Sequence, residues 1–144
     1  TLIGPYGTRD VIADDQYIRD LEALDIDFMA YQDEIGVQKT KLAESAGFYE
    51  RLKRVHDKAG RAKLWADVEV FEFEGEVYKS ALLPAPFERV KKQLEAVSPY
   101  VEEILIYEYP GLMNKPGSGA FAGHPSSEKL YTDYMAFCKS KQDE

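Results

Sequence analysis

The sequence predicts an α/β fold built from four consecutive βα units. Four short apolar segments are each followed by a polar or Gly/Pro-containing loop and then by an amphipathic helix. The strands begin near residues 2, 26, 62 and 102, a spacing typical of a βα repeat. Such alternation implies parallel strands covered by helices, because each connection must return to the same end of the sheet. We expect 144 residues to form a single domain, residues 1–144.

The four units follow one another along the chain. The first places a strand at TLI and a helix in DDQYIRDLEALD, and the second a strand at IDFMAYQ and a helix in LAESAGFYERLKRVHDKAG. Gly60 should end that second helix, because glycine accepts a left-handed backbone. The third unit runs from the strand AKLWADVEVFEF through an acidic loop to the helix FERVKKQLEAVSPY. The fourth runs from VEEILIYEY through a long loop to EKLYTDYMAFCKSK.

Two architectures compete for this pattern, an open doubly wound sheet and a (β/α)8 TIM-type barrel. A Rossmann-type site is disfavoured, because no G-x-G-x-x-G follows the first strand and no P-loop motif occurs. A complete barrel needs about 250 residues, so four units correspond to about half of one. In the third strand Leu64, Ala66 and Val68 share an apolar face, whereas Asp67 and Glu69 point the other way. We therefore expect half of a barrel.

Composition excludes several functions. The net charge of −8 and the pI near 4.9 disfavour nucleic acid as a partner, because phosphate binding needs clustered cations. No apolar run has the roughly 20 residues of a membrane span. The single cysteine, Cys138, permits neither an internal disulfide nor a multi-cysteine metal site. The first residue is Thr1 rather than Met, which suggests a piece of a longer precursor. No cofactor is expected.

Polar side chains end three successive strands, where parallel sheets place their active sites. The second strand ends with Gln32 and Asp33, the third contains Glu69, and the fourth ends with Glu108. Alternation predicts that Ile106 and Glu108 share the inward face of the fourth strand. A single strand-end carboxylate is often only a solvated edge, but the combination indicates a site.

Three motifs accompany these acids. They are Q-D-x-x-G at Gln32, Asp33 and Gly36, W-A-x-x-E-x-F-E at Trp65, Ala66, Glu69, Phe71 and Glu72, and E-Y-P at Glu108, Tyr109 and Pro110. The set resembles the uncharacterised glycoside-hydrolase-like TIM-barrel domains of bacterial carbohydrate-degrading systems, a domain-of-unknown-function family. The resemblance implies the last four units of a barrel, a carbohydrate ligand, and a periplasmic or secreted location.

Glycoside hydrolysis uses two carboxyl groups on either side of the scissile bond. Glu69 and Glu108 lie on neighbouring strands, about 4.8 Å apart, so we expect them to be catalytic, Glu69 as nucleophile or base and Glu108 as acid or orienting group. In the large barrel glycosidase clan the nucleophile follows the seventh strand, the position of Glu69, and the acid follows the fourth strand, outside this chain. We expect substrate contacts from polar and aromatic side chains near the strand ends: Gln32, Asp33, Asp67, Glu72, Tyr6, Tyr31, Tyr107 and Tyr109. Trp65 precedes the acids in its strand, and we expect it in the core rather than as a platform for a sugar ring.

Other functions remain open. A non-catalytic carbohydrate-binding or scaffold barrel module is the main alternative. An aldolase- or isomerase-like barrel is disfavoured, because no lysine ends a strand for Schiff-base chemistry. A Ca²⁺ or Mg²⁺ site formed by Asp67, Glu69 and Glu72 has less support, although hard cations prefer oxygen ligands, and we do not expect a metal site. His56 is expected on the surface. Because a half barrel leaves strand edges uncovered, we expect a homodimer or association with the remaining half of a barrel.

Overall fold

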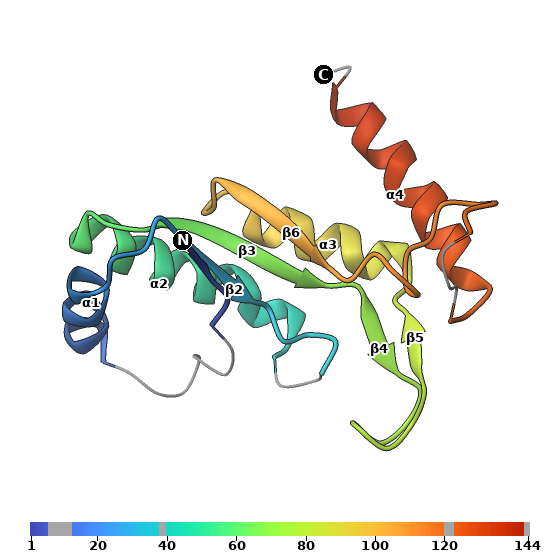
Figure 1. The fold of residues 1–144 in the computed structure, drawn as a ribbon, viewed down its shortest axis with the longest axis horizontal. Helices are drawn as coiled ribbons and strands as arrows, with labels where there is room; N and C mark the ends of the chain where they lie inside the picture. The colour runs from blue at the N-terminus through green and yellow to red at the C-terminus, as the bar shows by residue number, and fades with distance from the viewer. Residues whose placement is uncertain (6–12, 38–39, 120–122, 143–144) are drawn as a thin grey trace.

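The computed structural model describes residues 1–5, 13–37, 40–119 and 123–142. Figure 1 shows a central sheet flanked by helices, with a short hairpin projecting from one end. The elements in chain order are β1 (Leu2–Ile3), α1 (Asp14–Ala23), β2 (Phe28–Gln32), α2 (Leu42–Ala59), β3 (Lys63–Glu69), β4 (Phe71–Phe73), β5 (Leu82–Pro84), α3 (Phe87–Val97), β6 (Glu103–Tyr107) and α4 (Ser126–Gln142). None of the described helices is long and apolar enough to cross a membrane.

The main sheet has the order β1-β2-β3-β6, and each neighbouring pair is parallel. Every connection between its strands contains a helix, and the predicted α/β fold with four βα units and a parallel sheet is confirmed. Gly60 ends α2 in the left-handed conformation, with a φ of 63°, as the sequence predicted. The register pairs Gln32 with Asp67 and Glu69 with Tyr107, so these four residues lie on one face of the sheet.

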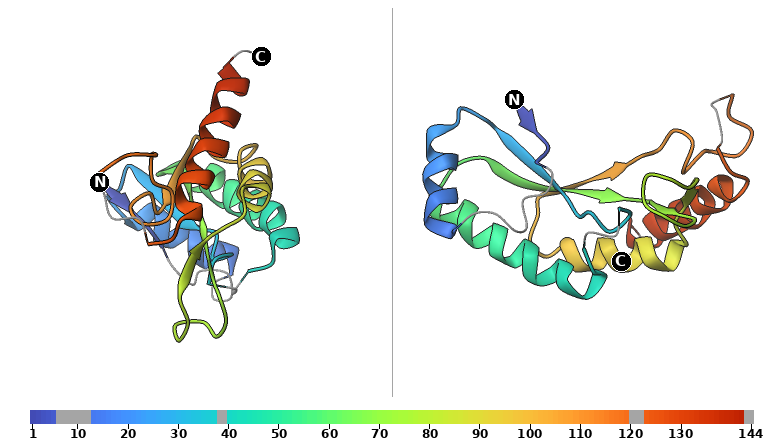
Figure 2. Two further views of the ribbon diagram at one scale, coloured as in Figure 1. Left: turned by 90° about the vertical axis from the view of Figure 1, so that its right-hand side faces the viewer. Right: turned by 90° about the horizontal axis from the view of Figure 1, so that it is seen from below.

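The helices cover one face of the sheet. The right-hand view of Figure 2 shows α2 and α3 beneath the strands, with α1 beside α2 at the left-hand end. On that face Leu64, Ala66 and Val68 are at most 4% exposed, whereas Trp65 and Asp67 on the other face are half-buried. A doubly wound sheet carries helices on both faces, while a barrel carries them only outside. One-sided cover is therefore the arrangement of a barrel segment.

The third predicted strand, residues 62–73, is in fact two strands. β3 ends at Glu69, and the chain turns at Val70, whose N–H donates to the Tyr107 carbonyl at 2.8 Å. β4 then leaves the main sheet and pairs antiparallel with β5. Polar and apolar residues alternate within each of the two strands, and no Gly or Pro separates them, which is why the sequence suggested one element. The consecutive burial of Val70 and Phe71 is where the alternation breaks.

The side chains of Tyr31 in β2 and His56 in α2 differ from expectation, because both are buried between the sheet and the helices. Tyr31, predicted to contact a sugar, is fully buried on the helix-covered face. His56, predicted on the surface, is 5% exposed. Its Nε2 lies 2.9 Å from the Tyr31 hydroxyl and its Nδ1 lies 2.7 Å from the Ala62 carbonyl, while Tyr17 donates to the Tyr31 hydroxyl. Burial lowers the pKa of His56, so the neutral ring links α2 to β2.

Candidate functional site

A cavity of about 520 Å³ opens at the carboxyl ends of β2, β3 and β6. Gln32, Glu69 and Glu108 line it, so the structure brings together the three strand-end residues that the sequence singled out. The β4–β5 hairpin supplies another wall, with Phe71, Phe73, Tyr78, Ser80 and Leu82. Acidic and amide groups thus face an apolar and aromatic surface across one hollow, a combination typical of ligand sites.

Glu108 reaches the cavity by a route that alternation did not predict. Ile106 pairs with Val68 on the helix-covered face, so the inward residue of β6 is Tyr107, opposite Glu69. The strand ends at Tyr107, so Glu108 is the first residue beyond it. Glu108 therefore enters the site from the loop after β6 rather than from the inward face of the strand.

The loop after β2 holds the carboxylate of Glu69. The side chain is 2% exposed, and its Oε2 accepts a hydrogen bond from the Val37 N–H at 3.1 Å. Gly36 makes this approach possible. A Cβ there would lie 2.7 Å from the Phe71 carbonyl oxygen and 2.8 Å from Glu69 Oε2, closer than any side chain can fit. The Q-D-x-x-G motif thus has a structural reason at its last position.

Asp33 lies beneath the cavity instead of on it. It is fully buried, and its Oδ1 accepts hydrogen bonds from the backbone N–H groups of Ile35 at 3.3 Å and Glu69 at 3.2 Å. Gln93 of α3 donates to Asp33 Oδ2 at 2.6 Å and to the Glu69 carbonyl at 3.0 Å. The predicted contact with substrate is wrong, because these bonds aim the carboxyl group into the protein. Asp33 positions Glu69.

The two buried carboxyl groups hold protons more tightly than usual. Burial raises the pKa of Asp33 to about 6, although its hydrogen bonds from Gln93 and Glu69 oppose the rise. Burial also raises the pKa of Glu69 to about 7, and the nearby charge of Asp33 adds to the effect. Arg89 lies close, with Nη2 3.4 Å from the Glu69 carbonyl, and compensates part of this negative charge. Glu69 can therefore exchange a proton near neutral pH.

The remaining predicted residues lie around the cavity or away from it. Asp67 shares the inner face with Glu69, and burial raises its pKa against the effect of a hydrogen bond with Gln32. Glu72 alternates with Phe71 and Phe73 in β4, so it points away from the cavity that they line, and its predicted substrate contact is wrong.

Two predicted aromatic contacts also need comment. Tyr109 is 39% exposed, but its hydroxyl accepts from the Lys115 N–H at 3.3 Å and its ring packs 6.0 Å from that of Tyr131, outside the cavity lining. Tyr6 falls outside the described residues. Among the residues that the structure describes, no group of three or more acidic, histidine or cysteine side chains could hold a metal ion. The three carboxylates considered for Ca²⁺ or Mg²⁺ do not converge, because Glu72 points away.

Sequence reasoning missed the hairpin wall and the support from α3. Tyr78 and Leu82 stand in a stretch that we interpreted as an acidic loop. The signal was present, since the alternating segment FEF at 71–73 and the apolar segment ALL at 81–83 lie on either side of Gly75, as in a hairpin with a longer loop. Gln93 was also detectable, because it falls on the buried face of α3 with Val90 and Leu94. A buried amide on an apolar helix face requires hydrogen-bond partners.

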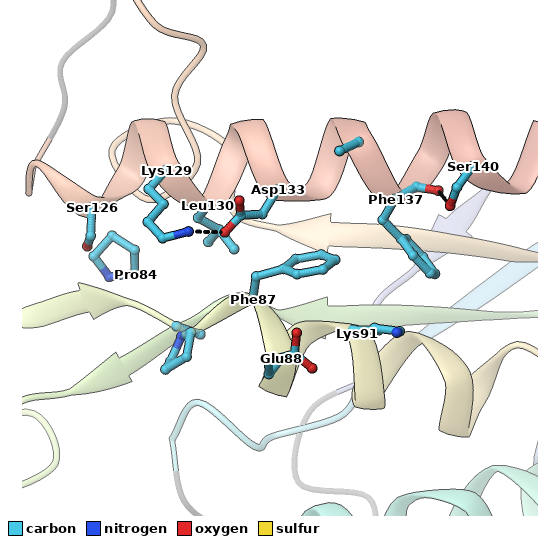
Figure 3. Close-up of a pocket in the computed structure, with 13 residues that line it drawn as sticks. Pro84, Phe87, Glu88, Lys91, Ser126, Lys129, Leu130, Asp133, Phe137 and Ser140 are labelled. Carbon is cyan, nitrogen blue, oxygen red and sulfur yellow. Dashed lines mark hydrogen bonds and ion pairs between the residues drawn. The ribbon is translucent and has the colours of Figure 1, made fainter.

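A larger cavity, of about 790 Å³, lies between α3 and α4 on the helix side of the molecule. Figure 3 shows Phe87 of α3 and Phe137 of α4 side by side in its lining, with ring centroids 5.9 Å apart and Leu130 nearby. Its carboxylate Asp133 is paired with Lys129 at 2.6 Å. None of the strand-end acids lines this cavity. It holds none of the predicted site residues.

Comparison with known proteins places the fold in context. A crystal structure from Bacteroides thetaiotaomicron, described as that of a "putative alpha-L-fucosidase", matches with a TM-score of 0.70 and 21% sequence identity. The match covers 94% of this chain and 44% of that one, so this chain spans less than half of the solved protein. Comparison with curated protein sequences gave no significant match. The family model described as "Domain of unknown function (DUF4434)" matches residues 1–120, and the chain therefore belongs to that family.

Proposed function

We propose that this chain is a glycoside-hydrolase-like domain that acts on carbohydrate at the cavity lined by Gln32, Glu69 and Glu108. The observation that carries the proposal is the convergence of two carboxylates and an amide, from three successive strand ends, on one hollow. The likeness of the fold to part of a solved protein described as a glycosidase supports it. Amide and carboxylate groups are suited to hydrogen-bond the hydroxyl groups of a sugar.

Of the two roles open to Glu69, nucleophile or base, its raised pKa favours the base. A base works best when its pKa lies near the operating pH, and that of Glu69 is about 7. In this reaction Glu69 takes a proton from water as the water oxygen bonds to the anomeric carbon. The glycosidic C–O bond breaks, and the departing oxygen receives a proton from a carboxylic acid. We assign that second role, or substrate orientation, to Glu108.

Hydrolysis of a panel of 4-nitrophenyl glycosides, by a protein that carries this chain within a complete barrel, tests the proposal. Glu69→Gln should lower the rate at least about 100-fold, the usual range for loss of a general base. Because the basic form of Glu69 is required, the wild-type rate should rise with pH through about 7. Glu72→Gln is the matched control, since that acid lies three residues away and points out of the cavity, and its rate should stay near wild type. Normal turnover by Glu69→Gln would remove Glu69 from the mechanism.

The non-catalytic alternative also has a specific observation in its favour. Glu69 is 2% exposed and bonded to the Val37 amide, as a purely structural carboxylate would be. If the chain is a carbohydrate-binding module, glycosides should bind without being cleaved. The wild-type protein should then show no hydrolysis, and Glu69→Gln should change only the binding affinity. Measuring saccharide binding by calorimetry beside the hydrolysis assay separates the two functions.

A further inference from the structure

A continuous row of aromatic rings leads away from the carboxylates of the candidate site. It starts at Tyr107, next to Glu108, and continues through Phe71 at a centroid distance of 6.3 Å and Phe73 at a further 6.0 Å. Tyr78, in the turn of the β4–β5 hairpin, lies 5.4 Å beyond Phe73. All four side chains line the same cavity. Figure 1 shows that the hairpin carrying the outer rings projects from the end of the main sheet.

The rings at the two ends of the row differ from those in the middle. Phe71 and Phe73 are 5% and 8% exposed, so they form the buried middle of the row. Tyr107 is 44% exposed and Tyr78 is 67% exposed. The cavity therefore presents two separate accessible rings, one beside the acids and one at its outer end. Large exposed aromatic side chains that line a cavity are characteristic of binding surfaces.

The turn that carries Tyr78 is well defined despite its exposure. The Ser80 hydroxyl accepts from the Gly75 N–H at 2.8 Å and donates to the Glu76 carbonyl at 3.0 Å, and the Lys79 N–H also donates to Glu76 at 3.0 Å. Tyr78 has a φ of 64°, a left-handed conformation that bulky residues rarely adopt. Such conformations persist where the surrounding structure imposes them, and they are frequent at ligand sites. Here the hairpin returns the ring toward Phe73.

We propose that Tyr107 and Tyr78 are platforms for two different sugar rings, so that the ligand is an oligosaccharide, or a glycoside with a second ring, rather than a monosaccharide. This inference rests on the proposed function. The apolar C–H face of a pyranose covers the flat face of an aromatic side chain, while its hydroxyl groups stay available to polar partners. The sugar ring bound on Tyr107 would lie beside Glu108, and the sugar ring bound on Tyr78 would lie along the hairpin, on the side of Leu82.

Calorimetric titration with methyl glycosides and their matched di- and trisaccharides tests the inference. We expect the oligosaccharide to bind about tenfold more tightly than its monosaccharide, which is the size of one additional aromatic contact. Tyr78→Asn should remove this gain while leaving monosaccharide binding unchanged, and Asn tolerates the left-handed backbone. Tyr78→Phe should keep the gain. Lys79→Ala, in the same turn but outside the cavity lining, is the matched control.

Each result decides between the proposals. Equal affinity for mono- and oligosaccharides, or a gain that survives Tyr78→Asn, would overturn the two-platform inference and leave the proposed carbohydrate site standing. Absence of binding for every saccharide in the panel would overturn both. Loss of monosaccharide binding in Tyr78→Asn would contradict the separation of the two platforms, provided that circular dichroism shows an unchanged fold.

Discussion

Asp33 and Glu69 are two carboxyl groups that the fold keeps from water at the ends of neighbouring strands. Each is satisfied by hydrogen bonds from backbone or amide donors, and Gln93 bonds to both residues. Two like charges in one low-dielectric region raise each other's cost of ionisation. The proton affinity of Glu69 is thus set partly by a residue that does not line the cavity.

Asp33→Asn should lower the pKa of Glu69 from about 7 toward its ordinary value, because the variant removes a negative charge that disfavours a second one. The fall should be partial, since burial is the larger cause and remains. Arg89 and Glu34 also face this region and are unchanged in the variant. Carbon-13 NMR of the glutamate carboxyl carbons measures the shift.

Glu72→Gln is the control for that measurement, because Glu72 carries the same charge on the other side of β4. This variant should leave the pKa of Glu69 unchanged. A Glu69 pKa that Asp33→Asn does not move would mean that Asp33 holds the backbone of β3 without influencing the proton. Its contribution would then be structural, through the hydrogen bonds that it accepts from the Glu69 N–H, the Ile35 N–H and Gln93.

At the scale of elements, the sequence predicted the helices and the parallel strands but not the hairpin. Glu69 could be placed at a strand end because polar residues alternate with the buried series Leu64, Ala66 and Val68. The alternation shifts by one position at the consecutive apolar residues Val70 and Phe71, and this shift is the mark that the turn leaves in the sequence. His56 could have been predicted as buried, since it stands four residues after Leu52, on the apolar face of α2. Its charged neighbours in the sequence masked that spacing.

The hydrogen bonds among Tyr17, Tyr31 and His56 join α1, β2 and α2 beneath the sheet. Tyr31→Phe removes the central hydroxyl and leaves buried polar atoms of the two other residues without this partner. We expect a loss of about 1–3 kcal/mol in the free energy of unfolding, measured by urea denaturation. Tyr107→Phe, at an exposed tyrosine, should change it by less than about 0.5 kcal/mol. Equal effects from the two variants would show that the buried bonds contribute little.

At the scale of the whole molecule, the inner face of the sheet is the feature that most needs a partner. Leu2 is 48% exposed and pairs with Phe28, whose ring packs on that of Trp65 with centroids 4.5 Å apart. None of the described helices α1, α2 and α3 covers this face. In a barrel this face packs against further strands. An apolar sheet face open to water favours association with a second surface.

We therefore predict that this chain associates, either with a second copy or with further strands of a barrel. Sedimentation of the 16.4 kDa chain over a range of concentrations should show a concentration-dependent increase in mass. Phe28→Ser should weaken the association, because it removes apolar area from the inner face. Leu82→Ser, at an exposed leucine of the hairpin, is the control. A stable monomer at every concentration would contradict self-association.

Because the helices cover only one face of the sheet, the positions of β3 should differ in how well they tolerate amino-acid substitution. From Leu64 to Val68 every second side chain is packed under helices, whereas Trp65 and Asp67 between them are only half-buried, so the loss of stability caused by random replacement should alternate with a period of two. The alternation ends at Glu69, because its side chain lies on the face without helices but is covered there by the loop that contains Val37. A deep mutational scan of seven residues would thus locate the edge of the site without any ligand in hand.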